Sequence, residues 1–443
     1  MYARRLPASF SRESFAQLAS RVADLSGLCW LDGEAPHPDG RFSFLGCEPV
    51  QRIESRSATR EPLAALAQLE DQPADLESST DADAPGPGDV PRFIGYVAYD
   101  AGLAGSASAL LRPSSRPVLS FARYDALIAR SHRSGESYVV GDDESACDRL
   151  LLRLTRPAQR LSARVGVVAA APREQHLEAI ERALQHIAAG DIYQVNLARM
   201  WQATFAGAPL ALWLRMREQG AVPLGFYYDD GERSVLVRTM ERFVRWERAQ
   251  RNLSSRPIKG TIARAGDRDA HDAAALRGDA KERAEHAMIV DLMRNDLGRV
   301  AEVGSVQVPE VMVVEPYAGL AHLVSTVTCR TRPDVTLRQV LDATFPPGSV
   351  TGTPKLRAMR VIESLEAVAR DVYTGAVGYV DRQGGLSLAV AIRCAVVERD
   401  TVRYYAGGGI VEASEPEREL AETELKARVF LDAVAALGVV IPP

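Results

Sequence analysis

The most constraining feature of this 443-residue chain is a change from a helical to a strand pattern at residues 173–199. In REQHLEAIERALQHIAAG, apolar side chains recur at helical spacing, and Gly190 suits a C-terminal cap. The next segment, DIYQVNLAR, is predicted to be a strand. Because strands and helices follow one another irregularly along the chain, we expect an α+β fold rather than a regular βαβ array. The apolar helix positions are Leu177, Ile180, Leu184 and Ile187.

The predicted strand after this helix has one polar face. Considered alone, the segment favours the interpretation that this face meets solvent. The alternative is a polar face turned inward, which would be costly without a polar ligand. Alternation places Tyr193, Val195 and Leu197 on one face, and Ile192, Gln194 and Asn196 on the other.

The first part of the chain is predicted to contain strands interrupted by an exposed loop. Residues 71–91 are acidic and rich in proline and glycine, which is typical of a surface loop. Beyond them, RFIGYVAYD and PVLSFARYDALIARSH are rich in aromatic and β-branched residues and are predicted to be strands. The pattern changes near residue 173, so we expect an N-terminal region at 1–165 and a second region at 170–436.

Composition is that of a globular protein, with 46% hydrophobic and 25% charged residues. A net charge of −5 gives no global attraction to nucleic acid or to anionic membranes. The five cysteines are far apart, which argues against a disulfide or zinc framework. The N-terminus lacks the apolar core of a signal peptide, and no apolar run approaches the roughly 20 residues of a membrane span. We therefore expect a cytoplasmic enzyme.

Two long helices are predicted in the second half of the chain, at residues 278–302 and 414–434. Asp279 is a plausible N-cap of the first helix. Ser414 and Glu417 have the spacing of a capping box at the start of the second. The expected buried positions of the first helix are Ala287, Met288, Val290, Leu292 and Met293.

Each of these helices carries two glutamates three residues apart and therefore on one face. Solvated surface glutamates explain either helix alone, and the spacing of Glu422 and Lys426 is that of an ordinary surface ion pair. The two helices could instead meet around one hard cation, since ligation by oxygen alone selects Mg²⁺ over zinc. The four residues are Glu282, Glu285, Glu419 and Glu422.

Two further segments have the composition of anion-binding loops. Gly407, Gly408 and Gly409 follow a predicted strand, and backbone N–H groups there could approach an anion without obstruction by a Cβ atom. A plain tight turn is the alternative. FPPGSVTGTPKLRAMRVIESLE is a second turn that enters a helix, whose N-terminus could bind a carboxylate.

Lys259 lies in the apolar, turn-rich segment SSRPIKGTIAR. Desolvation in such a setting can keep the amine neutral and make it a nucleophile, although most lone lysines are solvated. A nucleophile also needs an acid to protonate the leaving group, and Glu241 is a candidate because its neighbours are apolar. The residues alone indicate an α+β enzyme for a small, anionic, Mg²⁺-bound substrate.

Taken together, these segments closely resemble the chorismate-utilising enzymes, which include anthranilate, aminodeoxychorismate, isochorismate and salicylate synthases. The matching stretches occur in the family's order and cover about residues 173–432. The resemblance implies a single large domain of two stacked antiparallel β-sheets surrounded by helices. The stretches are GDIYQVNLAR, ERF, PIKGT, KERAEHAMIVDLMRNDLGRV, HLVSTV, FPPGSVTGTPKLRAMRVIE, YTGAVGYV, AIRCAV and GGGIVEASEPERELAETELKA.

The resemblance also implies a role for each site residue. Glu285 and Glu422 would bind Mg²⁺ directly, with Glu282 and Glu419 nearby, and the metal would hold the ring carboxylate of chorismate. Glu241 would protonate the departing 4-hydroxyl. The enolpyruvyl carboxylate would be bound by Arg393, Tyr373 and the N–H groups of Gly407 and Gly409. His322, Thr351 and Lys426 would line the pocket.

Two positions distinguish members of the family. Water-using members have a lysine where this chain has Gln194, and anthranilate synthases have alanine where it has Lys259. The motif PIKGT therefore resembles aminodeoxychorismate synthases, in which lysine adds at C2 and ammonia then attacks C4. We find no G-x-C-x-G nucleophile elbow, so a separate glutamine amidotransferase subunit is expected to supply ammonia.

The chain departs from the family pattern in two places. TMERF stands where S-P-E-R-F is usual, and CWLDG departs from the segment that binds tryptophan in relatives. The alternatives are an anthranilate or isochorismate synthase, or a non-catalytic relative that binds chorismate. Retention of Lys259, Glu241 and Arg393 argues against the last.

Overall fold

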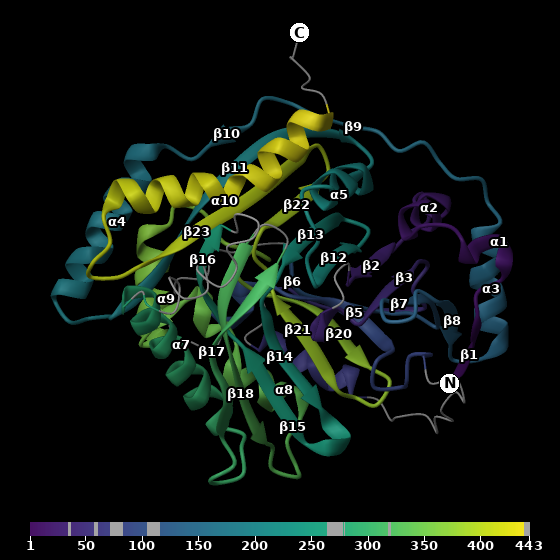
Figure 1. The fold of residues 1–443 in the computed structure, drawn as a ribbon. Coiled ribbons are helices and arrows are strands. Elements are labelled where there is room, and N and C mark those ends of the chain that lie inside the picture. Colours follow the sequence, from purple (N-terminus) through teal and green to yellow (C-terminus); the bar gives the residue numbers. More distant parts are fainter. Residues whose placement is uncertain are drawn as a thin grey trace.

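The computed structural model describes residues 1–33, 37–56, 61–70, 83–103, 116–263, 278, 280–317 and 320–437. Two antiparallel sheets lie face to face, and helices cover their outer surfaces (Figure 1). The predicted α+β fold with two stacked sheets is confirmed. No helix in these described ranges has both the length and the apolar composition needed to cross a bilayer.

The first sheet has 13 strands among the described residues, and β9 (Ala163–Val165) and β19 (Gly352–Thr353) pair with β11 off its main path. That path runs in the order β1 (Tyr2–Arg5), β8 (Ser137–Gly141), β7 (Ala126–Ser131), β3 (Phe42–Gly46), β2 (Cys29–Asp32), β12 (Leu224–Asp229), β13 (Arg233–Thr239), β22 (Cys394–Glu398), β23 (Thr401–Ile410), β11 (Gln194–Gly207) and β10 (Ala169–Ala170).

The second sheet has 10 strands in the same described ranges, with β17 (Gln307–Tyr317) paired to β18 off the main path. Its order is β16 (Ile258–Ala263), β18 (Leu320–Arg330), β15 (Asn252–Arg256), β14 (Arg242–Glu247), β21 (Leu386–Val390), β20 (Ala376–Asp381), β5 (Pro91–Val97), β6 (Pro117–Arg123) and β4 (Gln51–Arg56). The strands predicted in RFIGYVAYD and PVLSFARYDALIARSH are confirmed as β5, β6 and β7.

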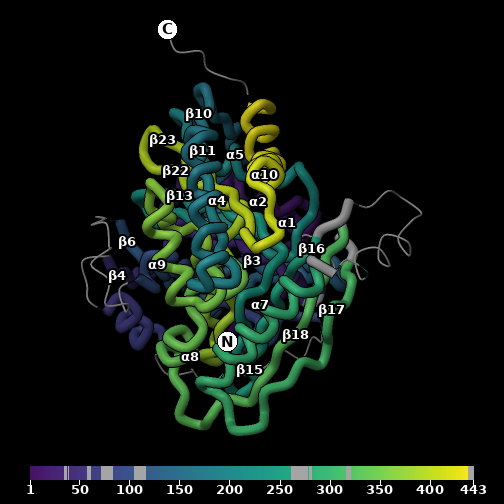
Figure 2. The backbone as a smooth tube through the Cα atoms, turned by 90° about the vertical axis from the view of Figure 1, so that its left-hand side faces the viewer, coloured from purple at the N-terminus to yellow at the C-terminus, as the bar shows by residue number. Residues whose placement is uncertain are grey.

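Helices pack on both outer faces of the stacked sheets. α5 (Pro209–Arg217) and α10 (Pro416–Leu437) cover the first sheet, whereas α7 (Ala280–Gly298) and α8 (Leu337–Thr344) cover the second. α4 (Arg173–Ala188) and α9 (Lys355–Leu365) pack against β11, and both lie with α7 and α10 on the side that faces the viewer in Figure 2. The remaining α-helices are α1 (Ala8–Ser11), α2 (Phe15–Arg21) and α3 (Glu144–Leu154). Short 3₁₀ helices are η1 (Pro38–Gly40), η2 (Pro62–Leu69), η3 (Tyr99–Gly102), η4 (Arg248–Gln250) and η6 (Gly348–Val350).

The core follows the two-residue period of the strands. In β13, Val235 and Val237 face the second sheet, and Leu236 between them faces the helices on the outside. The interior between the sheets is rich in aromatic residues, including Tyr96 and Tyr228. Because the sheets are apolar on both faces, polar side chains that are buried there without a hydrogen-bond partner stand out as candidates for function.

The predicted helix at residues 173–190 is confirmed as α4, and Gly190 has a φ of 76°, which favours glycine. The predicted first long helix is confirmed as α7, but Asp279, its predicted N-cap, lies outside the described residues. Val290 and Met293 are buried as predicted, whereas Ala287 is exposed and Met288 and Leu292 are half-buried.

The predicted capping box at the start of the second long helix is wrong. The Ser414 hydroxyl donates to Glu419 at 2.6 Å, and it accepts the backbone N–H of Val411 at 3.1 Å. Glu417 is exposed and pairs with Arg173 at 3.2 Å. Ser414 therefore orients a buried glutamate of α10.

Both sheets combine strands from early and late in the chain. In the first sheet β2 pairs with β12, and in the second β5 pairs with β20. The boundary expected near residue 173 therefore separates two stretches of sequence whose strands share both sheets. Of the acidic loop predicted at 71–91, residues 71–82 lie outside the described ranges, and β5 begins at Pro91.

Candidate functional site

Gln194, the first residue of β11, has a buried side-chain amide. Its relative exposure is 0%, and neither Nε2 nor Oε1 has a hydrogen-bond partner among the described residues. Asn196, on the same face, is half-buried. The prediction that this face meets solvent is therefore wrong, and the face turns inward. Tyr193, which was predicted to share a face with Val195, is instead 65% exposed, because the strand begins one residue later. A buried amide without partners is costly, so this position is suited to a polar ligand.

The glycines of β23 lie opposite β11, with Gly409 paired to Asn196 and Gly407 paired to Ala198. The N–H of Asn196 donates to Thr351, and the N–H of Ala198 donates to Glu366, so both groups point away from β23. In an antiparallel ladder, the backbone groups of two directly opposite residues either both hydrogen-bond across the pair or both point away from it. The N–H groups of Gly407 and Gly409 therefore face the other edge of β23.

That edge of β23 is open at the glycines, because the ladder with β22 ends at Tyr405. A Cβ atom at Gly409 would stand 2.6 Å from Nε2 of Gln194 and 3.4 Å from Nζ of Lys259. The absence of a Cβ atom at Gly409 thus permits these two side chains to approach the backbone closely. Three segments predicted separately from the sequence, at Gln194, Lys259 and Gly409, meet at this point.

Lys259 is half-buried in β16, next to a β-bulge. Gly260, immediately after it, has a φ of 71°, a conformation that glycine adopts without strain. The register with β18 shifts here, from Lys259 opposite Leu323 to Thr261 opposite His322. The bulge therefore gives the lysine a local backbone geometry different from that of its neighbours in the strand.

Glu241 lies between β13 and β14 and is 6% exposed. Burial raises its pKa to about 7, although the hydroxyl of Ser349, the charge of Lys259 and the backbone N–H of Ile258 each lower it. A carboxyl group with this pKa is partly protonated at neutral pH and can donate a proton. Sequence reasoning did not single out Ser349, although the PPGSVTGT turn that contains it was noted.

Two histidines close the site on the side of the second sheet. The pKa of His322 is lowered to about 4, chiefly by burial, and its Nδ1 lies 3.2 Å from the carbonyl oxygen of Gly260. Because a carbonyl can only accept, Nδ1 carries the proton in this neutral ring. His286, on α7, is fully buried, and its Nε2 lies 2.6 Å from the Ser325 hydroxyl.

The sequence interpretation missed His286. Burial and the nearby charge of Lys259 lower its pKa to about 4, so it lies within electrostatic reach of the lysine. Its position one helical turn after Glu282 was the available signal, since both residues lie on one face of α7.

The side chains predicted to bind the enolpyruvyl carboxylate occupy buried surroundings. Arg393 is half-buried and has a φ of 49°. Desolvation lowers the pKa of its guanidinium, so this cation gains from an anionic ligand. Tyr373 is buried and stacks on Tyr405 with ring centroids 5.3 Å apart. The hydroxyl of Thr351 donates within its own turn, to the carbonyl of Gly348 at 3.1 Å. Thr351 therefore supports the turn in this structure.

α10 brings Lys426 and two of the glutamates to the glycine strand. Nζ of Lys426 donates to the carbonyl of Gly407 at 2.9 Å and pairs with Glu422 at 2.7 Å, so the predicted ion pair is present. Glu419 is buried, and its Oε2 would lie 3.3 Å from a Cβ atom at Gly408.

The four predicted metal ligands supply only carboxylate oxygens, which suit Mg²⁺. Glu285 on α7 is buried like Glu419, and Glu282 is half-buried. Across the described ranges, however, no three or more Asp, Glu, His or Cys side chains are arranged to hold a metal ion. The carboxylate oxygens fit magnesium, but the four glutamates of the described chain are not close enough together to form a complete ligand set. The metal site therefore stays a prediction.

A family model described as chorismate binding enzyme matches residues 28–432. This range includes every site residue described above. The chain belongs to the chorismate-binding enzyme family. Its similarity to individual members extends over most of the chain.

Two relatives of this chorismate-binding chain have different names. It is 34% identical over 422 residues to aminodeoxychorismate synthase component 1 of Escherichia coli strain K12, covering 90% of this chain and 92% of the relative. It is 35% identical over 417 residues to anthranilate synthase component 1 of Methanothermobacter thermautotrophicus, covering 90% of this chain and 87% of the relative. Overall identity therefore does not separate the two activities.

Among solved structures, anthranilate synthase component I from Streptococcus pneumoniae TIGR4 superimposes with a TM-score of 0.75 at 29% identity. The superposition covers 90% of this chain and 93% of that chain. The chorismate-binding chain thus has the anthranilate synthase component I-like fold that the resemblance implied.

Proposed function

We propose that this chain converts chorismate and ammonia to 4-amino-4-deoxychorismate, the first step of 4-aminobenzoate synthesis. The observation that supports this most strongly is the position of Lys259, whose amine faces Gly409 beside the buried amide of Gln194. A lysine placed near a protonatable glutamate is suited to covalent catalysis.

In this proposal Lys259 and Glu241 share the first chemical step. The amine of Lys259 adds at C2 of chorismate, both ring double bonds shift by one position, and the C4–O bond breaks. Glu241 donates a proton to the departing oxygen, so water leaves. Ammonia then attacks C4, both double bonds return to their first positions, and the Lys259 amine leaves C2. The proton lost by the new amine returns Glu241 to its acid form. The elevated pKa of Glu241 supports its part as the acid.

Substrate binding would depend on groups around β23. Arg393, Tyr373 and the outward N–H groups of Gly407 and Gly409 would hold the enolpyruvyl carboxylate, with Lys426 adding positive charge. The neutral ring of His322 would contribute Nε2 as an acceptor at the wall of the pocket.

Mg²⁺, held by Glu282, Glu285, Glu419 and Glu422, would neutralise the ring carboxylate when bound. Excess EDTA should abolish chorismate turnover, and added Mg²⁺ should restore it. As a readout separate from activity, Mg²⁺ should raise the melting temperature of the wild-type protein, whereas a Glu285→Gln, Glu419→Gln double variant should lose that response. Full activity in excess EDTA would refute the metal site.

Ammonia is expected to come from a separate glutamine amidotransferase subunit. The relatives named above are each called component 1, which is consistent with a second component. A complex of this chain with the amidotransferase should use glutamine, whereas the isolated chain should depend on added ammonium salt.

The product decides between the proposal and its nearest alternative, anthranilate synthesis, which the second relative favours. Purified protein should be incubated with chorismate, Mg²⁺ and ammonium salt, and the products identified by mass spectrometry. The expected product is 4-amino-4-deoxychorismate without release of pyruvate. Anthranilate with pyruvate, or isochorismate alone, would refute the proposal.

A further inference from the structure

Arg370 is a buried arginine, 2% exposed, that lies behind the candidate site without being part of it. Its guanidinium donates five hydrogen bonds, which matches the five N–H donors of an arginine. Two go to Glu366, at 2.9 Å from Nε and 2.6 Å from Nη2. The other three go to Asn196, Val350 and Thr374.

These last three acceptors belong to three separate segments that carry site residues. Nη2 donates to the carbonyl of Asn196 at 2.6 Å, two residues after Gln194 in β11. Nη1 donates to the carbonyl of Val350 at 3.0 Å, in the turn that also contains Ser349, the hydrogen-bond partner of Glu241. One planar group thus fixes the distance between the strand and the turn.

The third segment is the turn that carries Tyr373. Nη1 of Arg370 donates to the Thr374 hydroxyl at 3.2 Å. Asp371 and Thr374 have φ values of 55° and 62°, a left-handed conformation that costs free energy for residues other than glycine. The surrounding contacts must therefore hold this turn in place.

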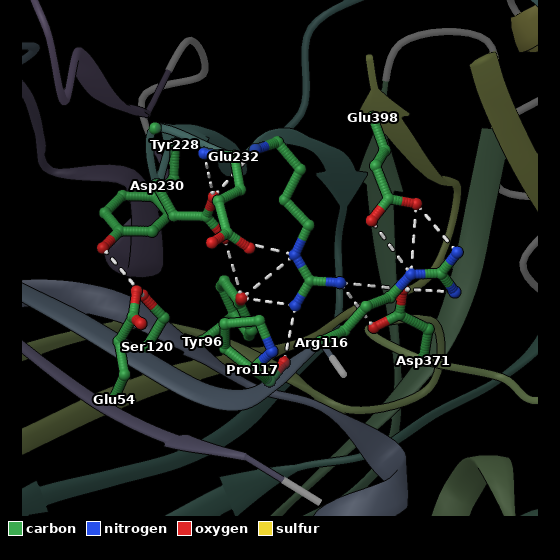
Figure 3. Close-up of polar contacts among 12 residues, drawn as sticks. Glu54, Tyr96, Arg116, Pro117, Ser120, Tyr228, Asp230, Glu232, Asp371 and Glu398 are labelled. Atoms are coloured by element: carbon green, nitrogen blue, oxygen red, sulfur yellow. Dashed lines mark hydrogen bonds and ion pairs between the residues drawn. The ribbon is translucent and has the colours of Figure 1, made fainter. Parts of the chain in front are cut away.

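A second buried arginine holds the same turn from its other side. Both carboxylate oxygens of Asp371 accept from Nη1 of Arg233 at 2.9 Å, and Arg233 also donates to the carbonyl of Pro117 at 2.6 Å. Figure 3 shows Asp371 in this network beside Arg116 and Tyr96. The turn is thus held by Arg370 on one side and by Arg233 and Arg116 on the other, and of these three guanidinium groups Arg370 is the one that hydrogen-bonds to β11 and to the 348–351 turn.

Glu366 extends the arrangement to the glycine strand. Besides pairing with Arg370, its Oε1 accepts the N–H of Ala198 at 2.8 Å. That bond directs the N–H of Ala198 away from β23. Because Gly407 lies directly opposite Ala198, the N–H of Gly407 faces the open edge of β23. The Arg370–Glu366 ion pair therefore supports both the segments that carry the catalytic residues and the strand that carries the carboxylate-binding glycines.

We propose that Arg370, together with Glu366, is a positioning residue that sets the relative placement of β11, the 348–351 turn and the Tyr373 turn for the reaction with chorismate. The inference rests on the proposed function only in requiring that chorismate is the substrate. Lysine cannot replace this group, because an ammonium is a point charge and lacks the planar fork that reaches several acceptors in fixed directions. Small displacements of catalytic groups lower kcat more than they weaken substrate binding.

The test compares Arg370→Lys with the wild type by following chorismate consumption, whatever the product. We expect kcat to fall by about tenfold to a hundredfold while KM for chorismate changes less than about threefold. Arg382→Lys is the matched control, because Arg382 is also buried, at 4% exposed, and pairs with Asp142 away from the site. The control should lower the melting temperature and leave kcat unchanged.

Thr374→Val provides a second variant if Arg370→Lys does not fold, since it removes one acceptor and keeps the arginine paired. It should lower kcat several-fold, with a smaller rise in KM for chorismate because Thr374 adjoins Tyr373. The inference is overturned if Arg370→Lys or Thr374→Val retains the wild-type kcat, or if the loss only follows the folded fraction, as in Arg382→Lys. A wild-type product other than 4-amino-4-deoxychorismate would refute the proposed function and leave this comparison intact.

Discussion

Replacement of Lys259 by alanine should lower chorismate turnover at low-millimolar ammonium by roughly a hundredfold or more, because the covalent step is lost. The amine lies 3.4 Å from the position of a Cβ atom on Gly409, to which Nε2 of Gln194 is also close. The wild-type protein incubated with chorismate without ammonia should form an adduct of chorismate less one water. Intact-mass analysis and peptide mapping should place that adduct on Lys259.

Lys259→Arg is the matched control for this prediction. It keeps a positive charge near Glu241 and His286, but its guanidinium stays protonated and is not a nucleophile. We expect it to be as inactive as Lys259→Ala while retaining the melting temperature. If either variant kept the wild-type rate, or if the adduct formed on another residue, the nucleophile assignment would be wrong.

Replacement of Glu241 by glutamine should lower kcat by about 10²- to 10⁴-fold, the usual contribution of a general acid. In the wild type the acid must be protonated, and its pKa is about 7, so kcat/KM should decline as the pH rises through 7. That alkaline limb should be missing from the small residual activity of the variant. Unchanged activity, or an unchanged alkaline limb, would remove Glu241 from the mechanism.

Thermal stability gives an independent check on the same carboxyl group. Its pKa is raised from 4.5 to about 7, so stability present below pH 4.5 is lost as the pH rises towards 7. Glutamine does not ionise. Glu241→Gln should therefore melt at a higher temperature than the wild type at pH 8, with the difference shrinking as the pH falls towards 4.5.

Much of the fold was predictable because it depends on local patterns. The helical period of α4, the glycine that ends it and the aromatic strands β5 to β7 all follow from residues close together in the sequence. The orientation of Gln194 did not follow, because a polar strand face is ordinarily exposed. It is covered by β16 and β23, which come from distant parts of the chain.

The sequence indicated the individual motifs of the candidate site, but not how their side chains are arranged in space. Lys259 and Glu241 were each indicated weakly on their own, and the resemblance to a family supplied their roles. Ser349 and His286 lie within segments that the sequence did indicate, but their importance depends on a hydrogen bond to Glu241 and on the nearby charge of Lys259, which only the folded chain provides. The predicted capping box at Ser414 was wrong because a buried glutamate competes for the same hydroxyl.

The interleaving of early and late strands has a consequence for synthesis on the ribosome. β5 is complete by residue 97, but its partner β20 begins at residue 376, so β5 remains without that neighbour while some 280 residues are translated. At about 5–20 residues per second, this interval lasts on the order of tens of seconds. During it, apolar strands of the N-terminal region are open to mispairing or to chaperones. Because β23 and α10 emerge after β20, the substrate pocket can form only when nearly the whole chain has left the ribosome.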